Sequence, residues 1–84
     1  MLFNIYWDKN NGGNCENVSI REVLSSIRTL SSNSYSDWEL KFWDKYNDSD
    51  FLVQVVDLEV DESVYIPYVN SDLDFKTLII TRVE

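Results

Sequence analysis

The chain has 84 residues and a formal net charge of −8 at pH 7, from 15 acidic and seven basic side chains. Its length predicts one domain, residues 1–84, with a single modest core, and its 44% hydrophobic content, with three Trp, five Tyr and four Phe, excludes intrinsic disorder. The acidic balance disfavours direct binding to nucleic acid or to anionic membranes, because both carry negative charge.

The residue types available restrict the chemistry further. The chain lacks histidine and has one cysteine, Cys15, which excludes nucleophilic catalysis of the Cys–His or Ser–His kind. Neighbouring carboxylates such as Asp57 and Glu59 are more typical of a solvated face than of a catalytic acid and base. Residues 44–50 lack the glycine that a calcium-binding loop needs for its sharp turn, and no helix is predicted on either side of them. We expect a protein that is not an enzyme and that holds no metal and no cofactor.

Cysteine usage and apolar patterning bear on location. A lone cysteine cannot form an internal disulfide, which suits a reducing cytoplasm. The N-terminal segment lacks the basic region and the apolar length of a signal peptide, and no run of about 18 apolar residues is present. We expect a cytoplasmic protein, in a bacterium or, if phage-encoded, in the cytoplasm of its host.

The first part of the chain predicts a strand, a polar loop and a helix. Residues 2–7 alternate with three large apolar side chains on one face, and a partly apolar opposite face indicates a central strand. Residues 8–17 are polar and contain Asn-Gly-Gly, which is typical of a loop. A helix is predicted over residues 20–32, because Ser19 and Glu22 have capping-box spacing and the apolar residues that follow form one stripe.

The second part predicts only strands. Residues 38–46 and 51–60 combine aromatic and β-branched side chains around a polar turn. Residues 64–69 predict another strand, in which Pro67 donates no backbone hydrogen bond and so favours the edge of the sheet. Residues 75–83 close the chain as a strand. The predicted fold is α+β, in the order β-α-β-β-β-β, with a four- to five-stranded, mostly antiparallel sheet and one helix packed on a face.

All of the net charge lies after residue 36. Residues 1–36 are balanced, whereas the rest of the chain carries twelve acids and four bases, and the segment from Asp57 to Asp74 has six acids and no base. The negative electrostatic field of these acids speeds encounter with a basic protein surface. The alternative is that the acids only keep a small domain soluble.

Aromatic side chains among these acids add candidate anchors. Trp7, Trp38 and Phe42 are expected to be core, and Trp43 falls on the opposite face of its predicted strand, so it is either an exposed anchor or covered by a second layer. The tyrosines beside the proline present the same two alternatives. The predicted partner-binding residues are the following aromatic and acidic side chains: Trp43, Asp44, Tyr46, Asp48, Asp50, Asp57, Glu59, Asp61, Glu62, Tyr65 and Tyr68.

The segments FNIYWD, NVSIREVLSSIRTL, WELKFW and FLVQVV follow one another in an order that is similar to the strand-helix-strand-strand opening of small immunity proteins. These Imm1-like proteins neutralise bacterial polymorphic or contact-dependent toxins. The resemblance covers residues 3–56, and no functional residue is carried over from it. It implies a cytoplasmic inhibitor that blocks a toxin active site with an acidic, aromatic surface.

Two other functions fit the same features. One is a phage-encoded anti-defence inhibitor, an anti-restriction or anti-CRISPR protein whose carboxylates mimic nucleic-acid phosphates. The other is a non-inhibitory assembly module that pairs through an edge strand. For an inhibitor of either kind, the expected partner is a basic protein surface, on a toxin or on a nucleic-acid-binding enzyme, and the free chain is expected to be monomeric.

Overall fold

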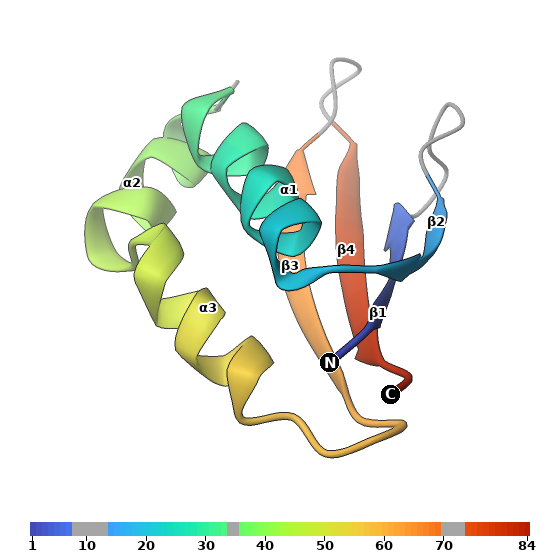
Figure 1. The fold of residues 1–84 in the computed structure, drawn as a ribbon. Coiled ribbons are helices and arrows are strands. Elements are labelled where there is room, and N and C mark those ends of the chain that lie inside the picture. The colour runs from blue at the N-terminus through green and yellow to red at the C-terminus, as the bar shows by residue number, and fades with distance from the viewer. Residues whose placement is uncertain (8–13, 34–35, 70–73) are drawn as a thin grey trace.

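The strands and helices form two layers in a computed structural model that describes residues 1–7, 14–33, 36–69 and 74–84. Four antiparallel strands make one sheet in the order β2-β1-β4-β3, and the helices lie on one side of it (Figure 1). The elements, in chain order, are β1 (Phe3–Trp7), β2 (Cys15–Val18), α1 (Ile20–Ser32), α2 (Asp37–Lys45), α3 (Asp48–Val56), β3 (Ser63–Val69) and β4 (Phe75–Arg82). The chain is therefore a small α+β domain with a four-stranded antiparallel sheet.

One hydrophobic core joins the two layers. The inner face of the sheet buries alternate residues of its three long strands, as the period of two along a strand requires, and α1 and α3 cover them with one apolar stripe each. The residues of this core from the sheet are Phe3, Ile5, Val64, Ile66, Tyr68, Leu78 and Ile80, and those from the helices and the loop after α3 are Val23, Ile27, Leu30, Phe51, Val55 and Leu58. No helix among the described residues is both long and apolar enough to cross a membrane.

Three of the predicted strands are confirmed. β1 is central, between β2 and β4, as its two partly apolar faces predicted, and β3 is at the edge, as Pro67 predicted. The polar segment predicted as a loop over residues 8–17 is wrong in its second half, because Cys15–Val18 pairs with β1 as a short edge strand. Its first half, residues 8–13, lies outside the described residues.

The predicted helix is confirmed as α1, Ile20–Ser32. Its predicted capping box is wrong. Ser19 occupies the N-cap position, but its side chain makes no cap hydrogen bond, and the amide of Glu22 donates to the backbone carbonyl of Ser19 at 3.1 Å instead. The start of α1 therefore has no side-chain cap from Ser19, and the helix is stabilised by its buried stripe, which begins at Val23.

The strands predicted over residues 38–46 and 51–60 are wrong, and with them the order β-α-β-β-β-β, because both segments are mainly helical. Alternation of Trp38, Leu40 and Phe42 suggested a strand, but Trp38 and Leu40 are exposed. A helical stripe competes with that alternation in the same residues: Glu39, Phe42 and Trp43 follow i, i+3, i+4 spacing and point inward. The inward stripe of α3 and the loop after it is Phe51, Val55 and Leu58.

The polar cluster predicted as a turn is the N-terminus of α3 and holds a reciprocal capping box. The amide of Asp50 donates to Oδ1 of Asn47 at 3.1 Å, and the amide of Asn47 donates to Oδ2 of Asp50 at 2.9 Å. Each side chain thus satisfies an amide that the helix leaves without a partner. This local device opposes the strand propensity of the β-branched residues that follow.

We expect Asn47→Ala to lower the free energy of unfolding by about 1 kcal/mol, because it removes the acceptor for the Asp50 amide. Ser19→Ala is the matched control, since Ser19 is also an N-cap residue but its side chain accepts no cap hydrogen bond. Urea unfolding of the two variants and the wild type checks the difference. Equal losses in both variants would contradict the capping box as the source of the effect.

Candidate functional site

The predicted partner-binding residues separate into two main groups at opposite ends of α3. That helix has nine residues and is about 13 Å long at 1.5 Å per residue. One group surrounds its N-terminus and includes Trp43 and Asp48; the other follows its C-terminus from Asp57 to Glu62. The strand predicted over residues 51–60, which would have carried Asp57 and Glu59 just before the strand over residues 64–69, does not form, because a helix end and a loop take its place.

The acids at the N-terminus of α3 already serve the fold. Asp50 belongs to the capping box, and half-buried Asp48 accepts a hydrogen bond from Nε of Arg28 on α1 at 3.4 Å. Both carboxylates lie in the first turn of α3, where the helix dipole favours negative charge. Asp44 is exposed on α2. The fold alone therefore accounts for Asp48 and Asp50.

The aromatic members of this group belong to a ring cluster between α2 and α3. Trp43 is half-buried and packs edge-to-face on Phe42 and Phe51, with ring centroids 5.1 and 5.5 Å apart. Tyr46 is more exposed; its ring lies 5.2 Å from Phe42, and Nζ of Lys45 lies 5.3 Å from its centroid. Of the two alternatives for Trp43, the structure shows the covered one, since this side chain packs against the core.

The two tyrosines of β3 lie on opposite faces of the sheet. Tyr68 is 9% exposed and packs edge-to-face on Trp7 on the inner face, with centroids 5.5 Å apart. Tyr65 is 62% exposed on the outer face. Only Tyr65 is available to a partner, and it lies on a different surface from the acids around α3.

The group after α3 forms an exposed acidic loop, by which we mean residues 57–62 with the side chains of Asp57, Glu59, Asp61 and Glu62. All four residues are exposed. Hydrogen bonds to its backbone hold the loop: Oε1 of the Glu62 side chain accepts from the Glu59 amide at 2.7 Å, and the amide of Asp61 donates to the carbonyl of Arg82 at 2.7 Å. Nη1 of Arg82 also donates to the carbonyl of Leu58 at 2.8 Å.

Three carboxylates of the acidic loop have no evident role in stability. Asp57 is the C-cap of α3, where the helix dipole disfavours negative charge, and no basic residue lies in the last turn. Asp61 adopts a positive φ of 72°, which asparagine and aspartate tolerate better than most residues. Within the described ranges, the carboxylates of Asp57, Glu59 and Asp61 make no ion pair. Their negative charge is therefore available to a partner.

Sequence reasoning missed two features of the structure. Glu39, expected on the solvent face of a strand, is 1% exposed, and its Oε2 accepts a hydrogen bond from the Val69 amide at 3.3 Å. It ties α2 to the edge strand. Val53, Val56 and Val60 are exposed beside the acidic loop, although valine favours burial and lowers helix propensity. The i+3 and i+4 spacing of Glu39 with Phe42 and Trp43 was the signal that could have identified its buried face.

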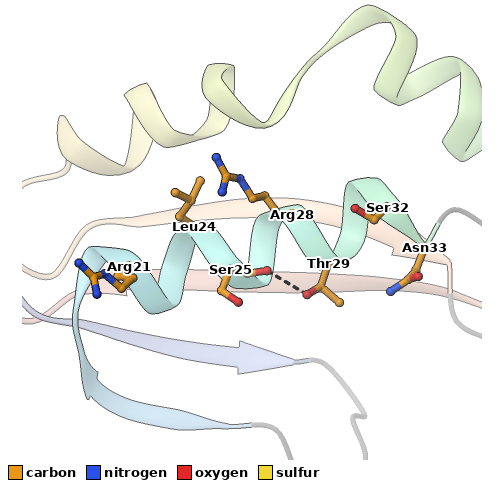
Figure 2. A pocket seen from close by; sticks show the side chains of 7 residues that line it. All are labelled: Arg21, Leu24, Ser25, Arg28, Thr29, Ser32 and Asn33. Carbon is orange, nitrogen blue, oxygen red and sulfur yellow. Dashed lines mark hydrogen bonds between the residues drawn. The ribbon is translucent and has the colours of Figure 1, made fainter.

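A shallow hollow of about 390 Å³ lies on the outer side of α1. Figure 2 shows that its side chains diverge: Leu24 and Arg28 point toward α3, whereas Ser25 and Thr29 lie on another side of the helix. Oγ1 of Thr29 donates to the carbonyl of Ser25 at 2.9 Å, and Arg28 is engaged with α3. No group of three or more metal-ligating side chains occurs among the residues the structure describes. The polar groups of this hollow do not converge on a common point.

The chain matches no protein-family model, and neither a curated protein nor a solved structure is detectably similar to it. Two of the four segments on which the resemblance to immunity proteins was based, WELKFW and FLVQVV, form helices and not strands.

Proposed function

We propose that this protein is a small acidic inhibitor that binds a basic surface of another protein through its acidic loop, most specifically an immunity protein that occludes a toxin's active site or substrate cleft. The observation that carries the proposal is the placement of Asp57, Glu59 and Asp61. These side chains are exposed and make no ion pair within the described residues, and Asp57 lies at a helix end where its charge costs stability. Charges that the fold does not need are available for recognition.

The loop is built to present its carboxylates at little entropic cost. Hydrogen bonds from Arg82 and within the loop fix the backbone on both sides of Glu59. A pre-ordered loop loses less conformational freedom on binding than a mobile one. The carboxylates would pair with Lys or Arg of the partner, and the surrounding negative field would accelerate the encounter.

The exposed valines supply the apolar part of the same surface. Val53 and Val56 are one turn apart on α3, and Val60 lies in the acidic loop. Protein interfaces combine an apolar centre with a polar rim. A basic partner that carries apolar side chains among its Lys and Arg would fit both features. The same recognition would suit the nucleic-acid cleft of a defence enzyme, so the identity of the captured partner separates immunity from anti-defence activity.

The salt dependence of binding tests this function. The tagged chain is used to capture its partner from the native host, and the purified partner is then titrated and assayed for its own activity. We expect inhibition at a 1:1 ratio and at least a tenfold loss of affinity between about 0.1 M and about 1 M salt, as the Debye length falls from about 10 Å to about 3 Å. An affinity that does not change with salt, or a bound partner with full activity, would contradict the proposal.

A further inference from the structure

β3 forms the longer of the two edges of the sheet (Figure 1). Its one neighbour in the sheet is β4, and the two strands pair in a regular register along all seven residues of Ser63–Val69. At the opposite edge, β2 has four residues, an irregular register with β1 and a positive φ of 54° at Asn17. Short and irregular edges resist the addition of another strand, so β3 is the edge that favours it.

Alternate peptide groups of β3 point away from the sheet. In an antiparallel pair, residues whose amide and carbonyl face the neighbouring strand alternate with residues whose groups face outward. The carbonyl of Glu62 accepts from the amide of Arg82 at 3.0 Å, which turns the even-numbered residues toward β4. The amide of Val69 accordingly donates outward, to Oε2 of Glu39 on α2. The other outward groups are the amides of Ser63 and Tyr65 and the carbonyls of Ser63, Tyr65 and Pro67.

These outward groups leave one part of the edge open. Within the described residues, the outward amide and carbonyl of Tyr65 make no hydrogen bond, and its side chain is 62% exposed. Pro67 has no amide to donate, but it keeps its carbonyl. The contact between Glu39 and Val69 occupies the far end of the strand. We call the backbone of residues 63–67 the open edge.

The open edge continues directly from the acidic loop. Asp61 and Glu62 precede Ser63, and the amide of Asp61 is tied to the carbonyl of Arg82 where β3 and β4 begin to pair. β3 itself has no charged side chain, and so it lacks the lysine that often protects an exposed edge from pairing. A segment laid along this edge therefore meets uncharged backbone beside Tyr65 and concentrated negative charge beside Ser63.

We propose that a basic, extended segment of the partner protein adds to the sheet as a further strand along the open edge, with its Lys or Arg side chains against the acidic loop. This mode of recognition rests on the proposed function and states how the partner is held. In such strand addition, backbone hydrogen bonds give affinity and side chains give specificity. Charge selects the occupant: a basic segment is drawn to the loop, whereas a second copy of this chain would bring another net charge of −8.

A proline at position 65 tests the open edge without breaking the sheet. Tyr65→Pro removes an amide that points away from β4, so the pairing of β3 with β4 loses no hydrogen bond. Tyr65→Val is the matched control, because it removes the same ring, keeps the amide and favours a strand. The probe is a blocked peptide of about eight alternating lysine and valine residues, titrated into the isotope-labelled chain and followed through the amide resonance of Ser63.

We expect the wild type and Tyr65→Val to bind this peptide with a dissociation constant on the order of 1 mM, since the open edge is short and is matched here without the rest of a partner. Tyr65→Pro should bind at least tenfold more weakly, because it lacks the amide and its ring obstructs the approach of a strand. The same peptide with every backbone amide methylated keeps its charge but donates no hydrogen bond, and it should not bind the wild type.

The comparison of the two peptides uses the wild-type chain, so it holds even if circular dichroism shows that Tyr65→Pro is unfolded. Equal binding of both peptides, no binding of the first peptide, or equal affinities of folded Tyr65→Pro and Tyr65→Val would overturn the open edge. The variant D57N/E59Q/D61N separates this outcome from failure of the proposed function. If that variant loses the peptide while Tyr65→Pro binds it as Tyr65→Val does, the acidic loop binds basic chains and the open edge does not.

Discussion

Neutralising three carboxylates in the variant D57N/E59Q/D61N should weaken binding of the protein partner about a hundredfold without disturbing the fold. Each exposed charge pair at an interface contributes about 1 kcal/mol, and three such losses correspond to roughly a hundredfold change in affinity. Asparagine is chosen at position 61 because the backbone there has a φ of 72°, where lysine would add strain. Glu62 is left unchanged, since its carboxylate holds the Glu59 amide.

The same variant should be at least as stable as the wild type. Asp57→Asn removes a negative charge from the C-terminal end of α3 and is expected to raise the free energy of unfolding by about 0.5 kcal/mol.

The control for the binding measurement is E16Q/E22Q/D37N, which changes the net charge equally, at exposed positions on β2, α1 and α2. Isothermal titration with the purified partner compares the affinities of the wild type, the D57N/E59Q/D61N variant and the control. Equal loss of affinity in the control would mean that net charge, and not the acidic loop, drives binding.

The sheet and the first helix were predictable because local pattern and tertiary role agree in them. In β3, alternation, β propensity and Pro67 all indicate the same edge strand, and in α1 a single apolar stripe has no competing period. The exposure of the acids in the segment 57–62 was also predictable, because carboxylates without partners remain in water. Their arrangement was not, since it depends on the element that precedes them.

The segment before the acidic loop carries two patterns at once, and tertiary packing decides between them. Trp38, Leu40 and Phe42 alternate like a strand, whereas Phe42, Trp43 and Tyr46 lie on one side of a helix. The choice is made by Phe51, which only α3 brings against Phe42 and Trp43. Contacts of this kind are absent from any local window of sequence, so propensity favoured the wrong element.

Trp43→Ala should lower the free energy of unfolding by about 3 kcal/mol, because it removes a ring that packs on both Phe42 and Phe51 at the edge of the core. Trp38→Ala is a control on the same helix. That side chain is 42% exposed and packs on Phe42 and on exposed Phe75, so its loss should cost about 1 kcal/mol. Urea unfolding followed by far-ultraviolet circular dichroism suits both variants, since each alters tryptophan fluorescence.

This pair of variants also decides what Trp43 does for binding. As part of the core, Trp43 affects the partner only through the fraction of folded chain, so the affinity measured for folded Trp43→Ala should equal that of the wild type. An anchor in the interface behaves in the opposite way and costs about 2 kcal/mol of binding energy when truncated. Wild-type stability with a thirtyfold weaker complex would therefore return Trp43 to the partner-binding surface, and would place a second contact at the N-terminal end of α3.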